Sequence, residues 1–144
     1  MTPKVILPQR HVSPGCKLTP YKGNLYVASE DTNQVTGYNN AGYSFVNISL
    51  EGPVGLFFEN TTNLLYMGSK STNAVTVFNV HTGKLSSLTF SDSSLSHPAG
   101  IAVDTATSTL YVISQNKNSG NHCWLSTFHY CSANAGTILC SINV

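Results

Sequence analysis

The chain has 144 residues, of which 41% are hydrophobic and only 9% are charged, and its formal net charge at pH 7 is +1. A length of this order supports one domain with its own core. The near-zero net charge excludes the basic footprint of a nucleic-acid-binding protein, and no apolar run approaches the roughly 18 residues of a membrane-spanning helix. We therefore expect no nucleic-acid partner and no membrane insertion.

Residues 1–13 are expected to form an N-terminal extension or an additional strand. Their apolar stretch, Val5–Leu7, is shorter than the roughly 7–15 residues of a signal-peptide core. No signal peptide is therefore predicted in this chain. An extracellular or cell-surface location is still expected, because Ser, Thr and Asn replace most of the charge that soluble domains carry. Two sequons, at Asn47 and Asn60, are candidate glycosylation sites in such a setting.

Three similar units follow along the rest of the chain, and we place them at about 14–52, 53–97 and 98–144. Each unit begins with a proline, and a Leu-Tyr pair follows at comparable spacing; the three tyrosines are Tyr26, Tyr66 and Tyr111. Their spacing corresponds to the period of about 40–45 residues that is typical of four-stranded β-propeller blades. Because these tyrosines occupy one position of the repeat, we expect all three to pack inside the blades.

The second unit shows the predicted strand pattern most clearly. Short apolar or alternating segments are separated by turn-rich segments, and no segment has a helical period. Strands are expected at 55–58, 64–69, 74–79 and 85–90. The predicted fold is therefore all-β, with three four-stranded antiparallel blades that make an incomplete propeller unless the chain self-associates.

Residues 98–104 (PAGIAVD) and 109–112 (TLYV) resemble the NHL-type repeat of six-bladed propellers. Residues 53–55 (PVG), 65–67 (LYM) and 73–78 (NAVTVF) are similar to it as well. The resemblance covers residues 14–114 well and the remainder poorly. It implies a propeller fold and leaves the function open, because such blades carry many chemistries.

Glu51 is the one candidate metal ligand. Glu51-Gly52-Pro53 resembles the Glu-Gly-Pro with which calcium-dependent lactonase propellers place a carboxylate on a metal. The resemblance implies an aspartate ligand at position 99, where this chain has Ala99. Asp104 matches a recurring aspartate that is expected to cap a turn. We therefore predict no intact metal site, no cofactor, no catalytic residues and no enzymatic activity.

Four cysteines are present, Cys16, Cys123, Cys131 and Cys140. They lack the CxxC spacing that zinc sites favour, so a disulfide is the simpler interpretation. If residues 122–129 and 136–142 form a hairpin, Cys123 and Cys140 lie near opposite positions. A Cys123–Cys140 bridge is the first expectation, Cys16 is expected to be a free buried thiol, and the other pairings stay open.

Three blades leave two blade faces uncovered, because propellers close with about four to eight blades. A homo-oligomer, either a ring or a filament, is the partner that this predicts. The alternative is a module that binds a glycan or a protein through exposed aromatic residues, with Trp124 and Tyr130 as possible ligand contacts. A fragment of a metal-dependent hydrolase propeller, with Glu51 at its site, is the third hypothesis.

Overall fold

The computed structural model describes residues 17–93, 95–116, 119–130, 133–134, 137–138 and 141–143. These residues form strands joined by turns, and none of them is helical. It follows that none of them belongs to a helix that could cross a membrane. The prediction of an all-β protein is confirmed.

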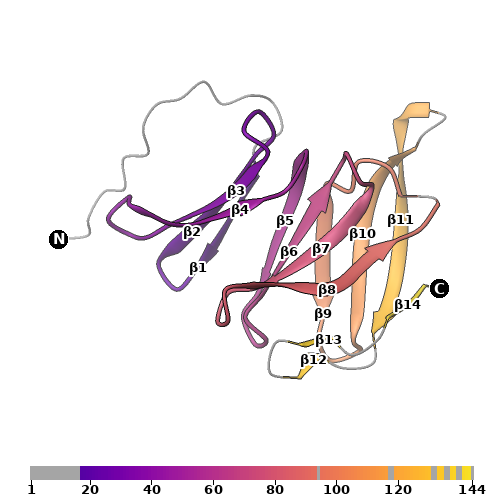
Figure 1. Ribbon diagram of the computed structural model, residues 1–144. Coiled ribbons are helices and arrows are strands. Elements are labelled where there is room, and N and C mark those ends of the chain that lie inside the picture. The colour runs from indigo at the N-terminus through magenta and orange to yellow at the C-terminus, as the bar shows by residue number, and fades with distance from the viewer. Residues whose placement is uncertain are drawn as a thin grey trace.

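Three four-stranded antiparallel sheets make up most of the structure (Figure 1). The strands of the first sheet are β1 Lys17–Tyr21, β2 Asn24–Ser29, β3 Gln34–Tyr38 and β4 Ser44–Ser49. Those of the second are β5 Pro53–Glu59, β6 Leu64–Ser69, β7 Ala74–Asn79 and β8 Lys84–Ser91. The third sheet contains β9 Gly100–Asp104, β10 Thr109–Asn116, β11 Ser119–Tyr130 and β14 Ser141–Asn143. A separate pair is formed by β12 Ala133–Asn134 and β13 Thr137–Ile138.

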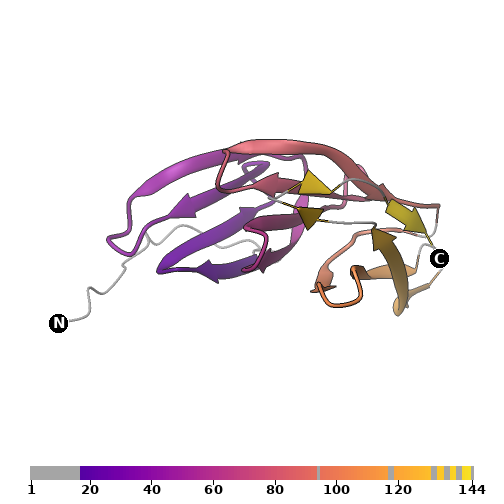
Figure 2. The same ribbon diagram turned by 90° about the horizontal axis from the view of Figure 1, so that it is seen from below.

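The sheets follow one another along an arc, with the second sheet between the other two (Figure 2). The first strands of successive sheets are neighbours, because β1 contacts β5 and β5 contacts β9. Within each sheet the remaining strands follow that first strand outward in chain order. In the third sheet the fourth strand is β14, because β12 and β13 pair with each other in a separate sheet. This is the arrangement of adjacent propeller blades, so the predicted incomplete propeller is confirmed in its fold class.

The pairing register shows which face of each blade meets its neighbour. We call the face toward the preceding blade the leading face and the face toward the following blade the trailing face. In β6, Leu65 belongs to the core shared with the first blade, and Tyr66 belongs to the core shared with the third. Successive residues of a strand point to opposite faces, so each Leu-Tyr pair of the repeat supplies one residue to each face.

Two hydrophobic cores result, one between each pair of neighbouring blades. The first contains Tyr26, Ala28, Val35, Ile48, Phe58, Leu65, Met67 and Phe78. The second contains Leu64, Tyr66, Val75, Val77, Phe90, Leu95, Leu110, Val112, Phe128 and Tyr130. Burying one large apolar side chain contributes about 1.5–3 kcal/mol. The blades are therefore held together chiefly by packing between sheets.

Gly68 marks a close backbone approach between the second and third blades. A Cβ built on this residue would lie 2.0 Å from the carbonyl oxygen of Pro98, and one built on Gly55 would lie 2.7 Å from the same oxygen. No side chain fits in that space, so both glycines are required by the close backbone contact. The proline that opens the third blade thus lies directly against the second blade.

Carboxylate and amide side chains cap the hairpin turns. Asp104 accepts hydrogen bonds from the Ala106 N–H (3.0 Å) and from the Thr107 hydroxyl (2.8 Å), which confirms its predicted role in a turn. Glu59 accepts bonds in the same way from the N–H groups and hydroxyls of Thr61 and Thr62. Burial alone would raise the pKa of Glu59, but these bonds lower it below its ordinary value.

Candidate functional site

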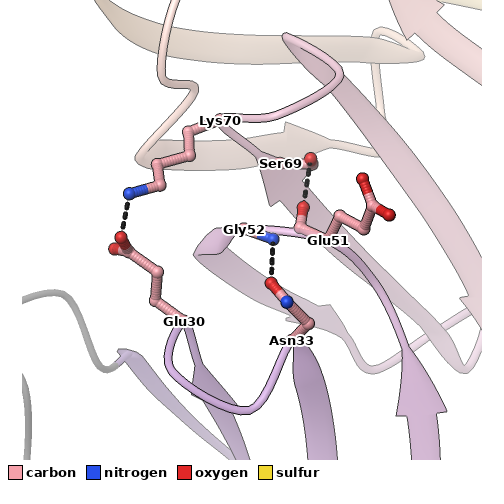
Figure 3. Close-up of polar contacts among 6 residues, drawn as sticks. All are labelled: Glu30, Asn33, Glu51, Gly52, Ser69 and Lys70. Carbon is pink, nitrogen blue, oxygen red and sulfur yellow. Dashed lines mark hydrogen bonds and ion pairs between the residues drawn. The ribbon is translucent and has the colours of Figure 1, made fainter.

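Glu51 lies in the connection between β4 and β5, at the junction of the first two blades. Its backbone oxygen accepts a hydrogen bond from the Ser69 hydroxyl at 2.6 Å. The next residue, Gly52, donates its N–H to Asn33 Oδ1 at 2.9 Å. The exposed carboxylate of Glu51 points away from these contacts (Figure 3). The junction thus uses the backbone of Glu51 and leaves its side chain in solvent.

The surroundings of Glu51 offer little to a metal ion. Within the part of the chain that the structure describes, no three His, Cys, Asp or Glu residues are grouped so that they could hold one. Calcium typically takes six to eight oxygen ligands, and one exposed carboxylate supplies two at most. Ala99, at the position where the resembled family has an aspartate, is exposed and offers no side-chain ligand. Glu51 therefore stays a candidate ligand for which the described residues supply no partner ligands.

The next blade junction repeats the amide contact. Asn73 Oδ1 accepts the N–H of His97 at 3.2 Å, as Asn33 does with Gly52. Asn33 and Asn73 have φ values of 51° and 52°, a left-handed conformation that asparagine tolerates better than most residues. Each residue that donates the N–H precedes the proline that opens the next blade. The asparagine contact is therefore part of how blades join, and we call it the junction latch.

An ion pair accompanies the latch at the first junction only, among the described residues. Lys70 pairs with Glu30 across the two blades (Figure 3). About a third of each side chain is exposed, 33% for Lys70 and 28% for Glu30. Pairs of this kind contribute about 0–1 kcal/mol. The ion pair is thus a minor part of the junction, which depends mainly on apolar packing.

The predicted Cys123–Cys140 disulfide is wrong. Cys123 is free and exposed, and it pairs with Gln115 of β10. Strand β14 pairs with Phe128–Tyr130, several positions beyond Cys123, so the predicted hairpin register does not form. Cys16, Cys131 and Cys140 lie outside the described residues.

The two aromatic residues predicted to contact a ligand differ in their surroundings. Tyr130 is only 4% exposed and belongs to the core between the second and third blades, so its prediction as a surface contact is wrong. Burial also raises its pKa. Trp124 is 52% exposed. It remains available as a contact for a ligand.

Both candidate glycosylation sites are exposed. Asn47 lies on β4, and its Oδ1 accepts a hydrogen bond from Thr36 at 2.9 Å. Asn60 lies in the turn between β5 and β6, where the hydroxyl of Thr62 donates to Glu59. The structure thus leaves both asparagine side chains accessible, and their modification stays a prediction.

The trailing face of the third blade is open and apolar. Tyr111, Ile113 and Leu125 are 37%, 48% and 63% exposed. Ile113 and Leu125 are cross-strand partners on β10 and β11, and Tyr111 pairs with Ala102 of β9, which is also exposed. These residues form one apolar surface across the sheet. An uncovered face at this end agrees with the expectation for three blades, but the expectation that Tyr111 packs inside its blade as Tyr26 and Tyr66 do is wrong.

The leading face of the first blade is also apolar at its centre. Leu25 pairs with Tyr38, and Val27 pairs with Thr36. All four side chains are partly exposed. The corresponding leucines of the other blades, Leu65 and Leu110, are fully buried. Both ends of the row of blades therefore present the kind of surface that is buried between blades.

Comparison with known proteins supports the fold. No protein-family model matches the chain, and no curated protein matches its sequence. Hydrazine synthase of Kuenenia stuttgartiensis is similar in structure, with a TM-score of 0.65 and 15% identity over 90% of this chain and 36% of that one. A protein of unknown function from Bacteroides caccae gives 0.64 and 16%, over 88% and 48%. A chain of the nidogen–laminin complex gives 0.53 and 8%, over 83% and 59%.

These identities are low enough that the likeness shows the fold alone, which is that of a β-propeller. The chain spans between 36% and 59% of the three structures. It therefore corresponds to a set of adjacent blades within the larger molecules that it resembles.

Proposed function

We propose that this chain is a non-enzymatic structural module, working outside the cell or at its surface, that associates with further copies of itself through its open blade faces. The proposal also assigns its repeats to the NHL type within the β-propellers. The observation that carries the proposal is the difference in solvent exposure among the three repeat tyrosines. Tyr26 and Tyr66 are 2% and 0% exposed beneath the next blade, whereas Tyr111 is 37% exposed.

Physical reasoning supports association at these faces. The last unit of a repeat array usually has a polar outer surface, because an apolar one aggregates. Here the outer surface keeps Tyr111 and Leu125, whose counterparts in the second blade, Tyr66 and Val75, are buried. Only 9% of the residues are charged, so little electrostatic repulsion opposes contact between copies. The low charge and the accessible Asn47 and Asn60 support the extracellular part of the proposal.

The mass of the 144-residue chain in solution tests the proposal. Light scattering coupled to size exclusion, over a concentration series, should show species larger than the monomer. A discrete oligomer would indicate a ring, and open-ended growth would indicate a filament. A strictly monomeric protein at high concentration would reject self-association.

A second candidate function is a binding module for a glycan or a protein, and the exposed Trp124 favours it. Tryptophan rings stack on sugars and are enriched at protein interfaces. Saturable binding on a glycan or secreted-protein array, lost on Trp124→Ala and kept in Tyr43→Ala, would support it. Tyr43 is 72% exposed and serves as the matched aromatic control.

A further inference from the structure

The two open faces are the two halves of one kind of interface. Tyr111 occupies the position of Tyr26 and Tyr66 in the repeat. Ile113 lies two residues after Tyr111 and pairs with Leu125 on the neighbouring strand. Gly68 lies two residues after Tyr66 and pairs with Val75 in the same way. Val75 is 0% exposed and Leu125 is 63% exposed. The open trailing face thus has apolar residues at positions that are buried where a following blade is present.

The opposite end shows the complementary half. Leu25 and Val27 occupy the positions of Leu65 and Met67, which are 0% exposed against the first blade. Tyr38 pairs with Leu25 as Phe78 pairs with Leu65. The open leading face therefore offers the residue types that a trailing face covers at both internal junctions.

We infer that the trailing face of one copy, built on Tyr111 and Leu125, docks on the leading face of a second copy, built on Leu25 and Val27, and that two copies close a ring. The inference rests on the self-association proposed above and specifies its partner and its faces. It is based on continuity with the two blade junctions already present in the chain. Neither face has a charged residue among these central positions, so no repulsion or buried charge opposes the contact.

Blade number selects the ring. The described residues of each copy form three blades, and propellers close with about four to eight. Two copies give six blades, whereas three copies would exceed that range. Two copies related by a twofold axis that coincides with the central axis of the ring make the same head-to-tail contact twice. Both open faces of each copy are then covered.

One residue shows that the junction between copies differs in detail from the internal ones. Ile113 lies where the covered trailing faces have Ala28 and Gly68. Gly68 contacts the Pro98 carbonyl so closely that a Cβ would lie 2.0 Å from that oxygen. Ile113 therefore requires wider spacing at that end of the interface. The other two central positions of the face keep apolar or aromatic side chains, Leu125 and Tyr111, as the covered faces do.

The test uses one charge on each face. Leu125→Arg blocks the trailing face and Val27→Arg blocks the leading face, while Ser87→Arg, at an exposed position on the outer strand of the middle blade, is the control. Mass is measured by light scattering at concentrations where the wild-type chain is dimeric. Head-to-tail docking predicts that each face variant alone is monomeric and that Ser87→Arg remains dimeric. In an equimolar mixture, the Val27→Arg copy keeps an unmutated trailing face and the Leu125→Arg copy keeps an unmutated leading face. One of the two junctions is then intact, so the mixture should form dimers at concentrations where each variant alone is monomeric.

Other results separate the two proposals. If the wild-type chain dimerises but only one face variant blocks it, or if the mixture associates no more strongly than either variant alone, the head-to-tail assignment is overturned while self-association stands. Open-ended growth of the wild-type chain overturns the closed ring alone. A monomeric wild-type chain overturns both proposals. Thermal melting checks that the variants fold, and Thr36→Arg replaces Val27→Arg on the same face if the latter does not.

Discussion

Tyr66 and Tyr111 occupy the same position in successive blades, yet Tyr66 is 0% exposed and Tyr111 is 37% exposed. Both side chains lie on the trailing face of their sheet. The difference arises because the third blade covers Tyr66 and no described residue covers Tyr111. One repeat position thus serves as core in one blade and as open surface in the next.

Truncation of these two tyrosines should therefore have unequal effects on stability. Tyr66→Ala removes a large core side chain and should lower the free energy of unfolding by about 3–5 kcal/mol. Tyr111→Ala should lower it by about 1 kcal/mol or less, because surface changes rarely cost more. Urea denaturation in a Leu125→Arg background, where association is blocked, gives both values. Equal losses would show that Tyr111 is buried in the monomer.

The fold could be predicted because the repeat marks each blade several times over. The prolines at 53 and 98, the Leu-Tyr pairs and the alternating strands all indicate the same period. Predicted strands at 64–69 and 74–79 agree with β6 and β7. The predicted 55–58 and 85–90 fall short of β5 and β8, which extend to Pro53–Glu59 and Lys84–Ser91. The ends of strands are harder to predict from the sequence, because residues next to a turn can continue the backbone pairing of a sheet without contributing an apolar side chain.

The candidate site was harder to predict, because it depends on neighbours that the repeat does not specify. The shared position of Tyr111 indicated burial, but burial also needs a following blade. Tyr130 lies two residues after Phe128 on β11, so alternation along that strand places both side chains in the same core. Cys123 was misplaced because the register of β11 is set by its pairing with β10, which shifts after Gln115.

The junction latch should make a measurable contribution through a single side chain. Asn73→Gly keeps the positive φ but loses the bond to the His97 N–H, and should lower the unfolding free energy by about 1 kcal/mol. Asn73→Ala also strains the left-handed backbone, which costs about 1–2 kcal/mol more. Urea denaturation of both variants separates the two contributions. If Asn73→Gly matches the wild type, the amide bond does not hold the junction.

Cys123 should react as an accessible thiol in the folded protein. Since its side chain is free and exposed, a maleimide reagent should label it without prior reduction. Cys123→Ser should remove this labelling and leave the melting temperature unchanged, because no disulfide is lost. Intact-mass analysis after brief native labelling checks the outcome. Labelling that appears only after reduction would mean that Cys123 is in a disulfide after all.

Alkaline pH should destabilise the fold through its buried tyrosines. Burial raises the pKa values of Tyr26, Tyr66 and Tyr130 above their ordinary value of 10.0. The unfolded chain therefore loses these protons near pH 10, while the folded chain keeps them. Stability should be fully present below pH 10 and should fall above it, by up to about 1.4 kcal/mol per pH unit for each tyrosine.

Tyr66→Phe isolates one of these groups, because it keeps the ring and removes the ionisable hydroxyl. Urea denaturation at pH 8.0 and at several values above 10 should show a shallower decline for this variant than for the wild type. The stability of Tyr43→Phe, a control at a side chain that is 72% exposed, should decline as that of the wild type does, because this variant keeps all three buried tyrosines. The same slope in all three proteins would mean that Tyr66 releases its proton as readily in the folded chain as in the unfolded one, which would contradict its burial between two blades.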